Sequence, residues 1–466
     1  MQVRGTDRTA GCVYTPDGPY TRRAHAYVMY IHRVILENIR CFEKLDLSFD
    51  QPDAEESNRY RGWKVITGDN AAGKSTLLKA IALALIGPEI ARALQPSLAG
   101  WIRNGAEKGT IAVEIKPNDM DSFSGGGRRP KATFFAELTL TRKNNDVSLS
   151  AGSEYVKSRR SAVKGPWALD CGVWFSSAYG PFRRLYGSSS EAARLMSAPG
   201  KPPRYATLFK EDATLAEGQY WLRDLRFRAL EGNPMDEQLL NDVQRMLNTD
   251  FLRHGLHIDS VDSDDLWLKD KDDVRLPLSE MSDGYRSSLA LLIDILRHLA
   301  AAYGPQGIVT EQQGRIVVPH PGVVLIDEID AHLHPQWQRT IGSWLREHFP
   351  NIQFIVSSHS AFVCQAADRK GLYRLPAPDE AGVAHRLDDD EWQKVVTGTP
   401  DVILRSEAFG MDHTRSPQAV EARRESRLLK AKKKATGKLT PEEEERMHQY
   451  DMFVNTADSD LSTSDC

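Results

Sequence analysis

A glycine-rich segment that ends in lysine and serine occupies positions 68–75, where the sequence is GDNAAGKS. This spacing matches the pattern GxxxxGK[ST], in which small residues allow backbone N–H groups to surround phosphate oxygens. Lys74 would then contact the β and γ phosphates of ATP, and the Ser75 hydroxyl would ligate Mg²⁺. The residues expected to bind ATP are Gly68, Asp69, Asn70, Ala71, Ala72, Gly73, Lys74, Ser75 and Thr76.

Two adjacent carboxylates follow an apolar run later in the chain, in the sequence VVLIDEID at 323–330. Asp327 is expected to hold Mg²⁺ through water at the end of a strand, and Glu328 is expected to act as the general base for water. Two acids at a strand end also occur in a solvated turn. The phosphate-binding pattern in the same chain favours the catalytic interpretation.

The sequence SSHS at 357–360 follows another apolar run, at 352–356. A single histidine after a strand is often an ordinary loop residue. Parallel sheets, however, place ligand-binding groups at the carboxyl ends of their strands. His359 is therefore expected to sense the γ phosphate, and it joins Lys74 and Glu328 in the expected catalytic set.

A possible anion-binding segment, LSEMSDGYR, lies at 278–286 and opens an amphipathic stretch that continues to residue 302. A helix N-terminus that presents a hydroxyl and free N–H groups can bind an anion, although the same pattern also occurs in an ordinary cap. Ser282, Asp283 and Gly284 are the residues of this segment that are expected to contact nucleotide.

The elements predicted around these motifs are strands and helices in alternation. A short buried strand is expected at 63–67, and further strands are expected at the mainly apolar runs 323–326 and 352–356, which suit central parallel strands covered on both faces. Helices are expected at 74–86, 218–247 and 284–302. Further strands are expected within 30–49, at 110–115 and at 132–140. The predicted fold class is therefore α/β.

The composition sets broad limits on function. The chain has 466 residues, a formal net charge of −4, and five cysteines without a CxxC pair. The overall charge gives no general case for nucleic-acid or membrane binding, and the cysteines indicate neither a disulfide framework nor a thiolate zinc site. No apolar run reaches the ~18 residues of a membrane span. We therefore expect a cytoplasmic protein that does not associate with a membrane.

The order of the four motifs resembles the ABC-type ATPase head shared by SMC and RecF proteins, over about residues 30–116 and 275–376. The resemblance implies a P-loop mixed or parallel sheet, an antiparallel β subdomain, a helical signature subdomain and C-terminal helices. It also implies a head-to-tail dimer, in which Ser282 and Gly284 contact the γ phosphate bound by a partner subunit. Arg40 is similar to the arginine that reaches nucleotide phosphates in SMC heads.

The segment Asp330–Pro335 resembles the D-loop that crosses this dimer interface. His332 and His334 alternatively suggest a metal pair, although no third ligand is evident. Three features depart from the family: the signature is MSDGYR where LSGGQ is usual, no heptad repeat indicates SMC arms, and no glutamine stands out as the Q-loop residue. The plausible Q-loop region is Tyr179–Arg183.

A closer resemblance comes from SDGYRSSLALLIDIL at 282–296, LIDEIDAHLHPQWQ at 325–338 and ILRSEAFGMD at 403–412. These segments resemble stand-alone bacterial anti-phage defence ATPases of the Septu (PtuA) kind, which act with an HNH nuclease partner. The resemblance implies an ATPase that dimerises and regulates a separate nuclease.

Two alternatives stay open. A RecF-like repair ATPase would contact DNA through Arg128, Arg129, Lys131 and the basic segment 423–438, although a solvated face is the simpler explanation for each basic stretch alone. An ATPase like the OLD nucleases would carry its own nuclease site. The acidic cluster Asp388–Glu391 lacks the separate glutamate strand that such a site needs.

The expected organisation has six parts. They are a flexible leader at 1–28, an ATPase lobe with the phosphate-binding pattern at 29–142, an inserted helical region at 143–278, a lobe with the signature, the carboxylates and His359 at 279–400, a helical interaction region at 401–456, and a disordered tail at 457–466.

Overall fold

The computed structural model describes residues 29–454, apart from gaps at 52–58, 118–122, 125–129, 145, 169–173, 186, 253 and 381. The expected leader and tail lie outside the described residues, as do Arg128 and Arg129.

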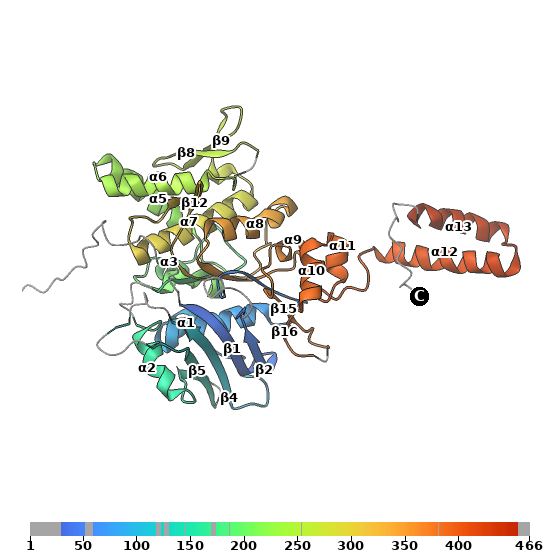
Figure 1. Ribbon diagram of the computed structural model, residues 1–466, viewed down its shortest axis with the longest axis horizontal. Coiled ribbons are helices and arrows are strands. Elements are labelled where there is room, and N and C mark those ends of the chain that lie inside the picture. The colour runs from blue at the N-terminus through green and yellow to red at the C-terminus, as the bar shows by residue number, and fades with distance from the viewer. Residues whose placement is uncertain are drawn as a thin grey trace, which may run out of the picture.

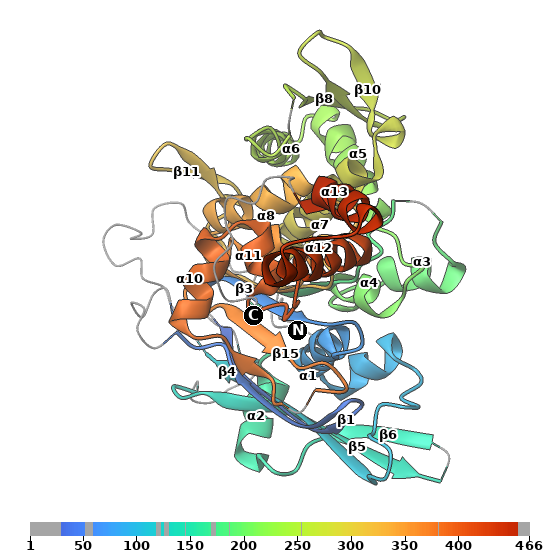
Figure 2. The same ribbon diagram turned by 90° about the vertical axis from the view of Figure 1, so that its right-hand side faces the viewer.

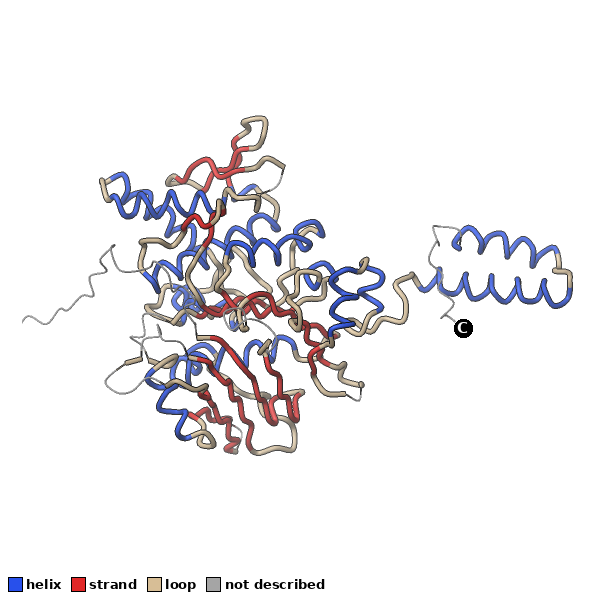
Figure 3. The backbone as a smooth tube through the Cα atoms, in the orientation of Figure 1, coloured by secondary structure: helices blue, strands red, loops and turns tan. Residues whose placement is uncertain are grey.

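A six-stranded sheet forms the centre of the molecule and is parallel except at one edge (Figure 3). Its strands follow the order β16 (His385–Arg386), β15 (Leu372–Leu375), β3 (Gly62–Gly68), β14 (Ile352–Ser357), β13 (Gly322–Ile326) and β7 (Ser176–Tyr179). Only β16 pairs in the antiparallel sense. The interior strands are buried along nearly their whole length, which explains why their sequences are mainly apolar.

A five-stranded antiparallel sheet lies on one side of the central sheet (Figure 1). Its order is β2 (Phe42–Ser48), β1 (Tyr30–Ile39), β4 (Lys108–Lys116), β5 (Phe134–Lys143) and β6 (Asp146–Ala151). The Gln353 side chain of β14 accepts a hydrogen bond from the Ile31 N–H (2.8 Å) and donates to the Ile31 carbonyl (2.9 Å). This pair of bonds joins the two sheets.

Helix α1 (Lys74–Leu94) packs against both sheets. The sequence predicted a helix over 74–86, and the observed helix continues beyond a kink at Gly87, which has a φ of 80°. Trp167 fills the space that a Cβ at Gly87 would occupy and donates from its indole nitrogen to the Ala84 carbonyl (2.7 Å). Pro88 begins the second part of the helix, where its missing N–H costs nothing.

A helical lobe carries the signature segment. Its helices are α5 (Ala216–Leu230), α6 (Pro234–Leu247) and α7 (Asp283–Tyr303). The prediction of one helix over 218–247 was wrong, because the chain turns at Gly232, with a φ of 90°, and Asn233 caps a new helix. A small sheet precedes α7 and contains β8 (His257–Val261), β9 (Leu266–Lys269) and β10 (Arg275–Pro277).

The remaining helices and strands before the C-terminal part connect these layers. They are α2 (Val156–Lys164), α3 (Ser190–Met196), η2 (Pro202–Arg204), α4 (Ala206–Phe209), η3 (Leu278–Glu280), β11 (Thr310–Gln312), β12 (Arg315–Val317), α8 (Pro335–His348) and α9 (Ala361–Cys364).

The C-terminal part contains two helix pairs. Helices α10 (Asp389–Thr397) and α11 (Pro400–Arg405) pack against each other and against α9. Helices α12 (Pro417–Thr436) and α13 (Pro441–Val454) form a hairpin that projects away from the rest of the molecule (Figures 1 and 2). Among the described residues, no helix combines the length and apolarity that crossing a membrane requires. The division into domains stays a prediction.

Candidate functional site

Three of the four expected segments meet at one edge of the central sheet. Strands β3, β14 and β13 are parallel neighbours, so the segments that follow them lie side by side at their carboxyl ends. These segments are the phosphate-binding loop (Gly68–Thr76), the carboxylate pair after β13, and the loop that contains His359. Strand β7 lies on the other side of β13, so the plausible Q-loop region begins at the same edge.

The phosphate-binding loop turns tightly between β3 and α1. Gly73 has a φ of 98°, and a Cβ there would come within 2.6 Å of both the Cys41 sulfur and the Phe42 ring. Only glycine fits this position without strain. The turn between β1 and β2 therefore lies directly against the loop.

Lys74 is the first residue of α1 and is 6% exposed. Its ammonium group donates to the carbonyls of Gly68 (2.8 Å) and Asp69 (2.9 Å). Burial lowers the pKa of Lys74, and the nearby carboxylates of Asp327 and Glu328 oppose this change. The lysine is thus held against the loop backbone, on the side of the carboxylate pair.

Arg40 lies on the other side of the loop. Its guanidinium donates to the Thr76 hydroxyl (3.4 Å) and lies 4.4 Å from the centre of the Trp101 ring. Burial lowers the pKa of Arg40. The structure therefore places this arginine at the start of α1, and its contact with nucleotide phosphates stays a prediction.

The carboxylate pair is fixed by the neighbouring strand β14. The Ser357 hydroxyl donates to Asp327 Oδ1 (2.5 Å) and accepts from the Glu328 N–H (2.8 Å). The Asp327 N–H donates to the Tyr179 carbonyl of β7 (2.8 Å). Asp327 is only 2% exposed, whereas Glu328 is partly exposed and has a φ of 45°. Ser357 had no predicted role of its own in the site.

Arg183, the last residue of the plausible Q-loop region, is a second residue for which the sequence predicted no role of its own. It follows β7, is 3% exposed, and donates to backbone carbonyls of the carboxylate segment. Its partners in the carboxylate segment lie 144 and more positions away in the sequence, so no local pattern reveals these contacts.

His359 is exposed between two buried serines. The Ser358 hydroxyl donates to Asp330 Oδ1 (2.6 Å), and the Ser360 hydroxyl donates to Gln338 Oε1 (2.7 Å). These bonds tie both ends of the His359 loop to the D-loop segment (Asp330–Pro335) and to α8. The imidazole is thus presented to solvent from an anchored backbone.

The signature residues lie at the start of α7. Ser282 is the exposed N-cap residue, and its hydroxyl accepts no capping hydrogen bond. A Cβ at Gly284 would lie 2.9 Å from the His332 carbonyl, so this helix start abuts the D-loop segment of its own chain. Asp283 pairs with Arg286. Within the described chain, no hydrogen bond joins Ser282 to the phosphate-binding loop.

A buried polar cluster lies between the signature helix and β7. Asp294 is fully buried, accepts from Arg297 (2.7 Å), and lies 3.3 Å from the His298 Nε2. Burial lowers the pKa of His298. Burial would raise the pKa of Asp294, but the charge and hydrogen bonds of His298 and Arg297 lower it overall. The hydroxyl of Tyr179, the last residue of β7, is buried close to Asp294, and burial raises its pKa well above the usual range.

The alternative sites have other structural roles. His334 caps α8 through its ring nitrogen. In the acidic cluster, Asp388 caps α10 by accepting from the Glu391 N–H (2.8 Å), and Asp389 pairs with Arg369 (2.6 Å). No group of three or more His, Cys, Asp or Glu residues in the described ranges is placed to hold a metal ion.

Comparison with known proteins identifies relatives among retron and Septu proteins. The retron Ec83 probable ATPase of Escherichia coli is 41% identical over 108 residues, which cover 23% of this chain and 18% of that protein. The Septu protein PtuA of Bacillus mycoides (strain KBAB4) is 24% identical over 339 residues, which cover 71% of this chain and 38% of that protein. The chain thus spans well under half the length of these relatives.

Among solved structures, an SMC head bound to the C-winged helix domain of ScpA aligns with a TM-score of 0.43 and 16% identity, covering 77% of this chain and 97% of that chain. The family model described as "AAA domain, putative AbiEii toxin, Type IV TA system" matches residues 65–365, which is more than half of the chain. The matched range includes the phosphate-binding loop, the carboxylate pair, the signature and His359. The chain therefore belongs to this AAA domain family and resembles Septu PtuA.

Proposed function

We propose that the chain binds ATP with Mg²⁺ at the edge of the central sheet. One observation carries the proposal: a desolvated lysine, a hydroxyl and two carboxylates follow adjacent parallel strands. Ser75 and Asp327 supply the oxygen ligands that Mg²⁺ prefers, and Lys74 supplies positive charge for the phosphates. When bound, the metal would neutralise negative charge on the triphosphate. Glu328 would act as the general base and His359 would contact the γ phosphate.

ATP would also close two heads into a head-to-tail dimer. The exposed start of α7 abuts the D-loop segment and carries Ser282 without a capping bond. Open N–H groups at a helix start suit a phosphate. Because this helix start is not joined to the phosphate-binding loop of its own chain, we assign Ser282, Asp283 and Gly284 to the γ phosphate held by the second head.

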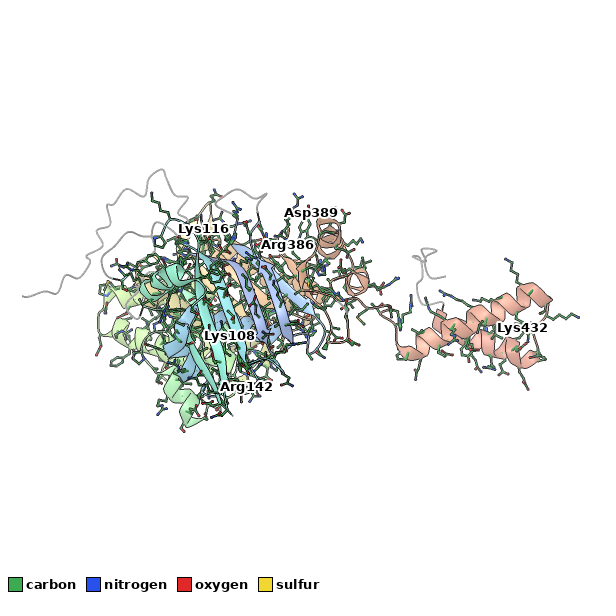
Figure 4. The ribbon with its side chains drawn as sticks, turned by 90° about the horizontal axis from the view of Figure 1, so that it is seen from below. Lys108, Lys116, Arg142, Arg386, Asp389 and Lys432 are labelled. Carbon is green, nitrogen blue, oxygen red and sulfur yellow. The ribbon has the colours of Figure 1, made fainter. Side chains whose placement is uncertain are left out.

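The dimer would in turn regulate a separate nuclease of HNH type in anti-phage defence, as the resemblance to Septu ATPases implies. We assign docking of the nuclease to the hairpin of α12 and α13, which projects from the head, with Lys432 at its far end (Figure 4). A ligand shifts an equilibrium only by its different affinity for two states. The nuclease must therefore bind a surface whose arrangement differs between separate heads and the closed dimer.

The DNA-repair alternative has less support. Lys432 and Lys433 of the basic segment pair with Glu443 (2.5 Å) and Glu444 (3.4 Å) of α13. Part of the positive charge of the hairpin is thus balanced within the hairpin itself. We therefore favour a protein partner over DNA.

Light scattering of the Glu328→Gln protein tests dimer closure. We expect its mass to double on addition of Mg-ATP, because ATP that is bound but not hydrolysed would hold the closed state. A second substitution, Ser282→Arg, should keep the protein monomeric, because it places bulk and charge at the interface. An unchanged mass of Glu328→Gln with saturating Mg-ATP would contradict the dimer.

Truncation after Arg415 tests the docking assignment. It removes α12 and α13 but keeps α11 and the hydrogen bond between Thr414 and Asp401. The truncated protein should bind ATP normally and lose both co-purification of an HNH nuclease encoded by a neighbouring gene and protection of cells from phage. Retention of both would place docking elsewhere, and nuclease activity of the isolated chain would favour the OLD-like alternative.

A further inference from the structure

Arg183 is a buried cation whose partners are all backbone carbonyls. Its Nη1 donates to Gly180 (2.9 Å) and Asp327 (3.0 Å), and its Nη2 donates to Glu328 (3.1 Å), Ile329 (3.3 Å) and Ala331 (3.3 Å). In the described chain, none of these bonds ends on a carboxylate. A buried guanidinium is usually paired with an acid, because an isolated buried charge is costly.

The charge of Arg183 persists despite its burial. Burial lowers the pKa of Arg183 to about 10, and the carboxylates of Asp330, Asp327 and Glu328 oppose this change. The guanidinium is therefore protonated at neutral pH. The guanidinium interacts electrostatically with these three carboxylates, and within the described chain it forms a hydrogen bond to none of them.

The carboxylate segment, residues 327–332, contains backbone carbonyls that a guanidinium can bind. Residues 327–332 form an irregular turn, and Glu328 and His332 have φ values of 45° and 66°. Carbonyls in an irregular segment lack the regular partners that a helix or a sheet would supply, although the Glu328 carbonyl also accepts from the Ala331 N–H (2.9 Å). The planar guanidinium provides several donors in a fixed geometry, and it binds four of these carbonyls at once.

The carboxylate segment is consequently held from both sides of β13. Ser357 at the end of β14 holds the Glu328 N–H and the Asp327 carboxylate. Arg183, which follows β7, holds the carbonyls. Fixing both faces of these peptide groups also fixes the directions in which the side chains of Asp327 and Glu328 leave the backbone.

We propose that Arg183 is a positioning residue for ATP hydrolysis, which sets the orientation of Asp327, Glu328 and the D-loop segment through their backbone carbonyls. This inference rests on the proposed roles of the two carboxylates. Lysine cannot replace Arg183, because a compact ammonium group cannot span the carbonyls from Asp327 to Ala331.

The first test compares Arg183→Lys with Arg184→Lys in the full-length chain. Arg184 is exposed and lies over the Phe182 ring, 5.3 Å from its centre, so it provides a matched control. We expect Arg183→Lys to lower kcat by about 10²-fold, the size of effect that small misplacement of a catalytic group produces. Its KM and its Kd for ATP should stay close to wild type, and Arg184→Lys should keep the wild-type kcat. A wild-type kcat in Arg183→Lys, or a KM that rises as much as kcat falls, would overturn the inference.

The second test needs no turnover. Hydrogen–deuterium exchange over residues 327–333 should be faster in Arg183→Lys than in wild type and unchanged in Arg184→Lys, since the first substitution alone releases the carbonyls. Equal exchange in all three proteins would overturn the inference.

The Glu328→Gln variant, assayed in parallel, separates this inference from the proposed function. Retained hydrolysis in Glu328→Gln would overturn the proposed role of Glu328 and the inference with it. If Glu328→Gln loses hydrolysis while Arg183→Lys keeps it, the proposed function stands and only the role of Arg183 fails.

Discussion

Lys74 is the side chain on which nucleotide affinity should depend most. Its ammonium group now donates to the carbonyls of Gly68 and Asp69, and phosphate oxygens would replace these acceptors. Lys74→Ala should weaken ATP binding by about 10²-fold, since hydrogen bonds to charged groups contribute up to ~3 kcal/mol. Calorimetric titration measures the change, with Lys108→Ala, an exposed lysine of β4, as the control. Equal ATP affinities of wild type and a folded Lys74→Ala protein would contradict the assignment.

Short sequence motifs mark some residues of the candidate site but not others. The phosphate-binding loop, the carboxylate pair and His359 could be predicted, because each short motif carries its own chemistry and follows a recognisable apolar strand. Ser357 and Arg183 could not, because their importance depends on which strands are neighbours. Apart from Gly180, the partners of Arg183 lie 144 to 148 positions away, and all of them are backbone carbonyls, which no side-chain pattern marks.

At the scale of elements, the turn between β1 and β2 supports the phosphate-binding loop through Gly73. Gly73→Ala should destabilise the protein and weaken ATP binding, because alanine would meet Cys41 and Phe42 in addition to the cost of positive φ, ~1–3 kcal/mol. Gly105→Ala is the matched control, since Gly105 has a φ of 87° and no atom near its Cβ position. Thermal unfolding and ATP titration of both variants isolate the effect of the contact. Equal losses of stability and ATP affinity in the two variants would show that the contact of position 73 with Cys41 and Phe42 contributes to neither.

The buried cluster between α7 and β7 should make stability depend on pH. His298 has a lowered pKa in the folded state, so the unfolded chain binds its proton more readily as the pH falls below ~6.5. The free energy of unfolding should therefore decrease between pH 7 and pH 5, by at most ~1.4 kcal/mol per pH unit from this residue. Asp294, whose pKa is also lowered, contributes only when the pH falls below ~4.

The His298→Gln variant checks this pH dependence by urea unfolding at several pH values. Its unfolding free energy should fall less steeply than that of wild type between pH 7 and pH 5, whatever its stability at pH 7. Parallel curves for the two proteins would show that His298 does not titrate on unfolding in this range.

The sequence predicted elements well where one physical signal dominated. The predictions of the interior strands β3, β13 and β14 were correct, because burial on both faces favours mainly apolar sequences. The prediction of a single helix over 218–247 was wrong. Helical periodicity continues across this range, but the chain turns at Gly232 and Asn233 caps a second helix. The length of α1 was underestimated, because Trp167 supports the chain at Gly87 and this contact is invisible in the local sequence.

At the scale of the whole molecule, the central sheet gathers segments that are almost 300 positions apart in the sequence. The order of the motifs predicted the α/β head, but it did not show that the signature helix start would lie against the D-loop segment of its own chain. That placement supports the proposal that a second head completes the ATP site. In the alternative arrangement, a single chain would enclose the nucleotide without a second head.

Photo-crosslinking between two distinguishable chains tests this central claim most directly. A photoreactive amino acid replaces Asn70, an exposed residue of the phosphate-binding loop, in a tagged Glu328→Gln chain, which is mixed with an isotope-labelled Glu328→Gln chain. Mass spectrometry then locates the crosslinks. The account predicts that Mg-ATP produces crosslinks from position 70 to residues 278–286 of the other chain. Crosslinks to that segment that form only within one chain, or equally well without nucleotide, would contradict it.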